Sequence, residues 1–311
     1  MNTAARSKFL SGDTFFRLAL ASCASLILLI VIGMVVVMTN NSWLSIKEFG
    51  IGFLYGTTWD PIKGQFGALP FIYGTIVSAL LAVLIATPLS IAVAIFFVEQ
   101  APKSIARPMA FLVELLAAIP SVVYGLWAIF VLAPFLREYV YPPLQTYLGW
   151  LPFFSGSATG LGMLTGGIIL AIMITPIITA VVRDVLEAVP MTQREAALAL
   201  GATDWEKTRI VLANASSGIA GAVILGLGRA IGETMAITMV IGNRPQISAS
   251  LFEPGYTIAS VIANEFTEAT GELYISALVE MCLILFVVTF VVNAFAKLLI
   301  LSVGNKNTAA G

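Results

Sequence analysis

Six long apolar stretches dominate this 311-residue sequence, and each is long enough to cross a lipid bilayer as a helix. They cover residues 17–38, 70–98, 108–136, 159–182, 215–242 and 273–300. A transmembrane helix needs about 20 predominantly apolar residues. Soluble domains carry roughly 25% charged residues, whereas this chain has 11%. We therefore expect an all-α, polytopic membrane protein with six transmembrane helices.

The stretches divide the chain into three parts. Residues 1–69 hold the first helix and a long loop, residues 70–305 hold helices two to six, and residues 306–311 form a tail. The first stretch resembles a signal peptide because basic residues precede it. Its apolar run nevertheless lasts from Leu18 to Met38, and no small-residue cleavage site follows. We expect a retained helix.

The region before the fourth helix is uncharged but rich in residues that interrupt helices. No charge occurs between Tyr139 and Val182, yet this region contains Pro142, Pro143 and Pro152 and a Gly/Ser-rich stretch. Backbone that is not helical is tolerated at membrane depth only where protein or water satisfies it. We expect a loop or re-entrant segment there.

The distribution of lysine and arginine predicts the orientation, because cytoplasmic loops carry an excess of these residues. With the N-terminus inside, the inner segments hold Arg6, Lys8, Arg17, Lys103, Arg107, Arg183, Arg194, Lys207, Arg209, Lys297 and Lys306. The outer loops hold Lys47, Lys63, Arg137 and Arg244. Both termini are therefore expected in the cytoplasm.

Composition excludes several classes of function. The chain has no histidine, which removes histidine metal sites, Ser-His-Asp catalysis and histidine pH switches. Its formal charge of −1 gives no basic surplus for nucleic acid. The two cysteines, Cys23 and Cys282, lie in apolar runs, where we expect them to act as small hydrophobic residues. We expect no catalytic residue, no metal and no cofactor in this chain.

One basic residue, Arg229, belongs to no loop, because it lies near the middle of the fifth stretch. An arginine there costs at least about 2.5 kcal/mol and normally faces the protein interior or a water-filled path. Glu233 follows four residues later, so a continuous helix would place both side chains on one face. The two residues could form a structural ion pair. Alternatively, Arg229 could offer its charge to an oxyanion crossing the membrane, with Glu233 holding its geometry.

Charges return at high density in the loop of residues 183–213. Thr192 and Glu195 match a capping box, and Gly201 stands where a left-handed helix end is expected. Thr203 and Glu206 match a second capping box, which would start a helix running toward the fifth span. The first short helix could merely decorate the membrane surface, or its low apolar surface could seat in a groove of another protein.

A motif in this loop resembles the EAA loop that marks the permease subunits of bacterial ABC importers. The residues that carry it are Glu195, Ala196, Ala197 and Gly201, followed by Ile210, Val211 and Leu212. The segment is one residue shorter after the glycine than the usual pattern, and Ala213 stands where that pattern has proline. The resemblance implies that Glu195 to Gly201 dock in a cleft of an ATPase.

Two further motifs indicate a particular subgroup of these permeases. Residues 226–236, followed by residues 239–243, and residues 116–125 upstream resemble the PstC-type permeases of phosphate-specific ABC importers. This resemblance extends over nearly the whole chain from the second helix onward. It implies a type I ABC importer permease core, of the MetI-like kind, in a bacterial inner membrane, with Arg229 and Glu233 on the translocation path.

The same resemblance implies a set of partners. These are a PstA-type permease, a dimer of PstB-type ATPases, a PstS-type periplasmic phosphate-binding protein, inorganic phosphate and the surrounding lipid. No Gly-x-x-x-x-Gly-Lys-Ser/Thr loop for nucleotide phosphates occurs in the sequence. ATP is therefore expected to be hydrolysed by a partner, and this chain to be a non-catalytic transport subunit.

Three other functions remain open at this point. The same helices could conduct another oxyanion, such as sulfate or molybdate. A membrane enzyme could use the intramembrane glutamates on a lipid phosphate, although no nucleophile and base accompany them. A channel or passive scaffold would leave the charged loop between helices four and five without a purpose.

Overall fold

The computed structural model describes the backbone of residues 3–308 and the side chains of residues 12–298. Residues 309–311 of the predicted tail, and the side chains of Arg6, Lys8 and Lys306 used to predict orientation, lie outside this part. Every regular element in the described part is a helix. The longer elements are α1 (Thr3–Asn41), α4 (Leu69–Ile95) with its π-helical end η1 (Phe96–Gln100), α5 (Lys103–Ala117), α9 (Met163–Glu187), α11 (Asp204–Gly232) and α14 (Glu272–Thr308).

Shorter helices connect them. These are α2 (Trp43–Phe49), α3 (Gly52–Tyr55), α6 (Ser121–Trp127), η2 (Ala128–Leu132), α7 (Ala133–Phe135), η3 (Leu136–Val140), α8 (Tyr141–Leu148), η4 (Pro152–Phe154), α10 (Met191–Ala199), α12 (Met235–Val240) and α13 (Ile258–Glu265). Six helical segments of the described part are long and apolar enough to cross a membrane: Gly12–Asn41, Leu69–Gln100, Ser121–Leu148, Met163–Glu187, Asp204–Gly232 and Glu272–Leu298. The predicted six spans are confirmed, although their bounds differ.

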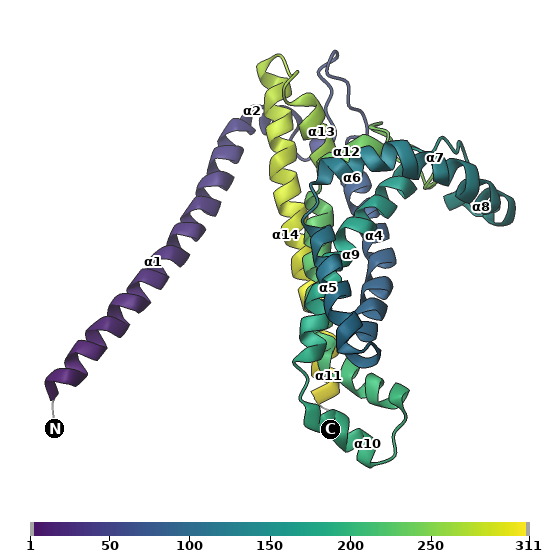
Figure 1. The fold of residues 1–311 in the computed structure, drawn as a ribbon. Coiled ribbons are helices and arrows are strands. Elements are labelled where there is room, and N and C mark those ends of the chain that lie inside the picture. The colour runs from purple at the N-terminus through teal and green to yellow at the C-terminus, as the bar shows by residue number, and fades with distance from the viewer. Residues whose placement is uncertain (1–2, 309–311) are drawn as a thin grey trace.

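The centre of the molecule is formed by α4, α9 and α11, which run side by side (Figure 1). Their shared core contains alanines of α4 and branched residues of α9, such as Ala82, Ala86, Ile174 and Ile178, all almost fully buried. Small side chains let transmembrane helices approach closely. The helix α14 packs on α11, and α5 packs on α9.

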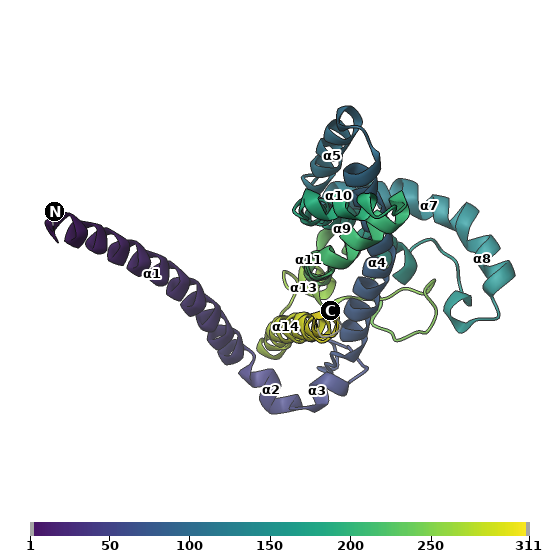
Figure 2. The same cartoon turned by 90° about the horizontal axis from the view of Figure 1, so that it is seen from below.

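The first helix, α1, leaves this bundle. It contacts α14 and α2 near its end at Asn41 and diverges from the bundle toward its start, as both views show (Figures 1 and 2). Its apolar side chains from Phe15 to Val37 are mostly exposed in the isolated chain. It is thus a helix that the rest of this chain does not cover.

The third predicted span, 108–136, is not one helix. A first helix, α5, ends at Ala117, and a second begins at Ser121 and continues to Leu148. Pro120 explains the break, because proline disfavours helical geometry in the residue before it and suits the first turn of the next helix. Glu114 of α5 forms an ion pair of 2.7 Å with Arg183 of α9, which links the first of these two helices to the centre of the bundle.

The helical run also extends further than predicted. Pro142 and Pro143 stand in the first turn of α8 (Tyr141–Leu148), where a missing N–H costs little, so they do not end the helix. An irregular loop with one short 3-10 turn follows, from residue 149 to residue 162. The expected non-helical segment is therefore present, but it starts only after α8.

The two ends of the bundle differ. The connection that contains α10 lies at one end, together with the start of α1 and the end of α14 (Figure 1). We call this the α10 end. An even number of spans places both ends of the described chain on that side. The connections that contain α2, α3 and α13 lie at the opposite end.

A carboxylate holds the loop at the opposite end. Glu265 of α13 accepts hydrogen bonds from Trp59 Nε1 at 2.8 Å, from Tyr274 Oη at 2.7 Å and from Tyr256 Oη at 3.3 Å. Burial raises the pKa of the Tyr256 hydroxyl, so this group stays a hydrogen-bond donor at neutral pH. These bonds fix the loop before α4 against α13 and α14.

Candidate functional site

The fifth span is interrupted inside the bundle. The helix α11 ends at Gly232, and Glu233 has extended geometry, with φ −70° and ψ 130°, before α12 begins at Met235. The apolar stretch of residues 215–242 predicts one continuous helix, and because of this break the prediction is wrong. Glu233 Oε1 accepts a hydrogen bond from the Ala236 N–H at 3.4 Å, and Thr234 Oγ1 donates to the Gly232 carbonyl at 3.3 Å. These bonds partly satisfy the backbone groups that the break releases.

Arg229 lies in the last turn of α11 rather than in the middle of a helix. It is nevertheless deep in the bundle, because Gly226, one turn earlier, packs on Ile178 near the middle of α9: a Cβ added at Gly226 would lie 2.6 Å from Ile178 Cδ1. The end of α11 is therefore close to half-way along the neighbouring span. Discontinuous helices that end at this depth form the binding sites of several transporter folds.

The expected Arg229–Glu233 ion pair is absent. Within residues 12–298, no carboxylate oxygen lies within 4.0 Å of the Arg229 guanidinium, and its side chain is exposed. The physical reason is the break, because Glu233 is no longer on the helix face that i, i+4 spacing would give it. The carbonyl end of α11 carries partial negative charge, which stabilises a cation in the last turn without a carboxylate.

Tyr124 of α6 is a polar side chain that bridges the other interrupted span. Its hydroxyl donates a hydrogen bond to the Leu116 carbonyl at 2.8 Å, across the break between α5 and α6. The helices α6 and α12 meet closely at Gly125, where an added Cβ would lie 2.5 Å from Met239 Sδ and 3.2 Å from Ala236 Cα. Two interrupted helices thus meet next to the break at Glu233.

A further polar side chain, Asn293 of α14, lies beside the last turn of α11, next to Gly228. A Cβ added at Gly228 would lie 3.7 Å from both Nδ2 and Oδ1 of Asn293. Nδ2 donates to the Thr289 carbonyl at 2.9 Å, whereas Oδ1 is buried without a hydrogen-bond partner in the described residues. An asparagine inside an otherwise apolar stretch was the available sequence signal.

The loop at the α10 end is shorter than predicted. Residues 188–203 connect α9 to α11, and α10 (Met191–Ala199) lies within them. The capping box expected at Thr192 and Glu195 is wrong, because α10 begins at Met191, two residues earlier than that box implies, with Pro190 at the cap position and no side-chain cap. The start of α10 is set by Pro190 instead, because proline is well tolerated at the beginning of a helix, where its missing N–H is not needed.

The other two helix signals of this loop are confirmed. Gly201 has φ +81°, the left-handed geometry that ends a helix at low cost only for glycine. Thr203 and Glu206 form the reciprocal capping box, with the Thr203 N–H donating to Glu206 Oε2 at 2.8 Å and the Glu206 N–H to Thr203 Oγ1 at 3.3 Å. The predicted second helix is continuous with the fifth span.

Exposure divides the four candidate residues of this loop. Glu195, Ala196 and Gly201 are exposed, whereas Ala197 is 6% exposed and faces its own chain. Three large apolar side chains are exposed beside them: Met191, Leu198 and Leu200, the last to 90%. The loop thus presents one carboxylate among apolar groups.

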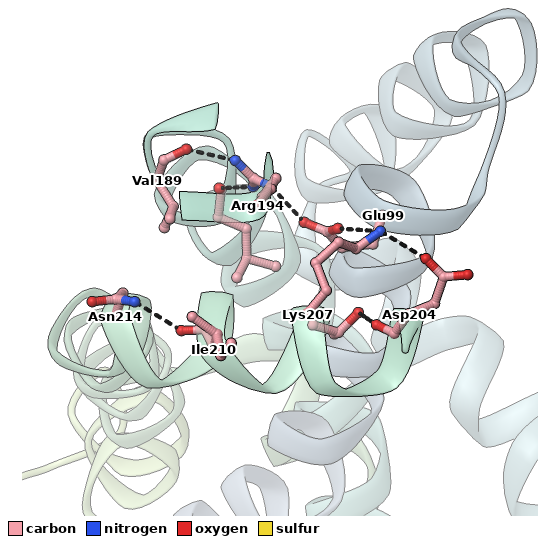
Figure 3. Close-up of polar contacts among 9 residues, drawn as sticks. Glu99, Val189, Arg194, Asp204, Lys207, Ile210 and Asn214 are labelled. Atoms are coloured by element: carbon pink, nitrogen blue, oxygen red, sulfur yellow. Dashed lines mark hydrogen bonds and ion pairs between the residues drawn. The ribbon is translucent and has the colours of Figure 1, made fainter. Parts of the chain in front are cut away.

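Arg194 fastens α10 to the bundle (Figure 3). Its Nη1 and Nη2 donate to the carbonyls of Val189 and Leu186, at 2.5 and 2.7 Å, and its Nε donates to Glu99 Oε1 at 3.0 Å. Leu186 belongs to the last turn of α9, Val189 follows that helix, and Glu99 belongs to η1. The α10 loop is therefore held by a side chain from within it.

Comparisons with known proteins agree with this architecture. Residues 86–303 match the sequence family described as the binding-protein-dependent transport system inner membrane component. This chain belongs to that family. Family membership makes the chain a multi-pass permease of a transport system, and the six spans, the interrupted fifth span and the α10 loop are features of this permease.

Close relatives refine the family. The permease is 45% identical to the phosphate transport system permease protein PstC of Mesorhizobium japonicum over 307 residues, which cover 97% of this chain and 94% of the relative. It is 46% identical to PstC of Haemophilus influenzae, over 93% of both chains, and 44% identical to PstC of Xylella fastidiosa strain 9a5c, over 95% of this chain and 92% of the relative. The permease belongs to the PstC group.

One solved structure with a similar fold is a chain of the methionine ABC transporter MetNI in an inward-facing conformation. The match has 18% sequence identity and a TM-score of 0.47, and it covers 74% of this chain and 93% of that chain.

Proposed function

We propose that this chain is the permease subunit of an ATP-driven importer of inorganic phosphate. The observation that carries the proposal is its identity of 44–46% over nearly the whole chain to relatives named phosphate transport permeases. The geometry adds a reason for an anionic substrate, because Arg229, in the last turn before the break, has no carboxylate partner among residues 12–298. Sulfate or molybdate would meet the same charge, but no relative reported above is named for either anion.

Arg229 is proposed to contact the anion. A guanidinium is charged at any physiological pH and presents five donors in a planar fork that matches phosphate oxygens. When a second permease covers this side chain, which is exposed in the isolated chain, its attraction for an anion becomes stronger than in water. Glu233 is proposed to keep the break in its open geometry through the Ala236 N–H, so that Arg229 points into the path.

The α10 loop is proposed to dock on an ATPase in the cytoplasm. Its exposed carboxylate, Glu195, lies among the apolar groups of Leu198 and Leu200, a combination suited to a groove of another protein. The sequence has no phosphate-binding loop of the Walker type, so this chain is proposed to be non-catalytic and its partner to hydrolyse ATP. Both termini would then be cytoplasmic.

The remaining partners follow from this proposal. A PstA-type permease would form the second half of the path, a dimer of PstB-type ATPases would bind at the α10 end, and a PstS-type binding protein would deliver phosphate at the opposite end in the periplasm. The membrane would be the bacterial inner membrane. The long exposed face of α1 leaves room for lipid or for the second permease.

The test is ATP-dependent uptake into vesicles that contain this chain, the three partners and ATP. We expect uptake of labelled phosphate that arsenate, a phosphate analogue, blocks and that a 100-fold excess of sulfate or molybdate leaves unchanged. Omission of the ATPase is the control and should abolish uptake. Uptake of sulfate or molybdate in place of phosphate would contradict the assigned substrate while leaving the permease architecture intact.

A further inference from the structure

A buried charge cluster joins the α10 loop to the second span. Glu99 lies in η1, the π-helical end of that span, and its side chain is only 4% exposed. Single π-helical turns are rare and occur frequently at functional sites. Two cations from the loop region face its two oxygens: Arg194 Nε lies 3.0 Å from Oε1, and Lys207 Nζ lies 3.5 Å from Oε2. Figure 3 shows the two cations converging on this carboxylate.

The cluster connects η1 with α10, which are far apart in the sequence. The helix α10 is covalently joined to α9 and α11, but the chain separates Glu99 from Arg194 by 95 residues. Arg194 also donates to a carbonyl in the last turn of α9, that of Leu186, and Lys207 lies in the first turn of α11. One carboxylate thus ties the second span to both neighbours of α10.

The helix α10 has little direct packing on the second span. Among the described elements, α11 is the one on which α10 packs extensively. A cavity of about 490 Å³ lies between the end of the second span and the start of α11, and Glu99, Trp205 and Lys207 are among its lining residues. The contact between Arg194 and Glu99 therefore supplies a direct connection between α10 and the second span.

The charged side chains of this cluster differ in their exposure to solvent. Arg194 and Lys207 have side chains 11% and 13% exposed, whereas Asp204, which contacts Lys207 Nζ at 3.0 Å, is 92% exposed. Solvent weakens an exposed ion pair, while a buried charge that loses one partner is strongly unfavourable. The ion pair between Glu99 and Arg194 is therefore the contact that resists displacement of α10 relative to the second span.

We propose that Glu99 is a positioning residue that transmits movement of α10 to the second span, so that docking-loop displacement reaches the transport path. This inference rests on the proposed function, since it takes α10 as the ATPase docking helix. Glu99 touches neither phosphate nor ATP. It acts through Arg194, which it holds at a fixed distance from η1.

The first experiment compares phosphate transported per ATP hydrolysed in the reconstituted complex. We expect Glu99→Gln to lower this ratio about tenfold, with the ATPase still bound and still hydrolysing ATP. Glu99→Asp, which keeps the charge, should recover part of the ratio. The matched control Asp204→Asn removes the exposed partner of Lys207 and should leave the ratio unchanged. A folded Glu99→Gln complex with the ratio of the unmodified complex would overturn the inference.

A second measurement does not depend on phosphate. Spin labels at Gln100→Cys and Thr192→Cys, both exposed positions, report the distance between η1 and α10 after the native cysteines are replaced by serine. Glu99→Gln should broaden this distance distribution in the full complex, whereas Asp204→Asn should not. If Glu99→Gln fails to fold, Arg194→Gln provides the same test from the other side. An unchanged distribution in a folded variant would contradict the link, whereas absent phosphate uptake by the unmodified complex would contradict only the proposed function.

Discussion

Arg194 and Arg229 lie in the same membrane protein with opposite arrangements of partners. Arg194 is 11% exposed and donates to one carboxylate and two carbonyls. Arg229 is exposed, and within the described residues no carboxylate lies within ion-pair distance. A guanidinium whose three nitrogens all donate within the protein holds elements together, whereas one with free donors can bind a ligand. The comparison therefore distinguishes Arg194, which has a structural role, from Arg229, which is a candidate binding residue.

The largest expected effect concerns the free guanidinium. Arg229→Ala should lower phosphate uptake by about 100-fold, equivalent to roughly 2.7 kcal/mol, because the anion loses its charged donor inside the bundle. Arg229→Lys, which keeps a charge but not the planar fork, should lose less. Uptake and co-purification with the partners are measured together. Full uptake by a correctly assembled Arg229→Ala complex would remove Arg229 from the path.

The second effect concerns the docking face at the α10 end. Glu195→Lys reverses the charge at an exposed position of α10 and should reduce ATPase binding at least about tenfold, since a like-charge contact at an interface costs several kcal/mol. Glu187→Lys makes the same charge change at an exposed position on α9, outside α10, and serves as the control. Pull-down of the ATPase and stimulated ATP turnover are the measurements. Equal loss in both variants would point to net charge rather than docking.

Glu233→Gln tests whether the break beside Arg229 needs a charge. The amide retains an oxygen that can accept from the Ala236 N–H, so a purely structural role predicts uptake within about twofold of the unmodified complex. Glu233→Ala removes the acceptor and should lower uptake further, by about fivefold. If Glu233→Gln and Glu233→Ala reduce uptake equally, the carboxylate charge matters and the structural role is contradicted.

The smallest expected effect concerns the turn that shapes the docking loop. Gly201→Ala places a side chain at φ +81° in open space, so the cost is the left-handed backbone alone, about 1 kcal/mol. Gly201→Asn should cost less, because asparagine tolerates this geometry. Hydrogen exchange of the α10 amides should accelerate about fivefold in the alanine variant. Equal exchange in both variants would contradict a backbone origin.

Local signals explain which parts of this structure were predictable. The six spans follow from apolar length, and Thr203, Glu206 and Gly201 follow from bonds between residues close in sequence. Pro120 is itself a local signal for the break between α5 and α6, because proline disfavours helical geometry in the residue before it. The break at Glu233 was missed, because its neighbour Gly232 is a residue that transmembrane helices also tolerate in their interior, so composition alone does not identify the end of α11.

The sequence by itself determined that this chain crosses a membrane, where its charges gather and how the α10 loop ends, because each of these depends on composition or on contacts a few residues apart. Only the tertiary structure decided that Arg229 stands without Glu233 and that Glu99 meets Arg194. These outcomes depend on how separate helices pack, and sequence distance does not specify which side chains will then face each other. One arginine was left exposed, with no carboxylate partner in the described residues, and the other was enclosed.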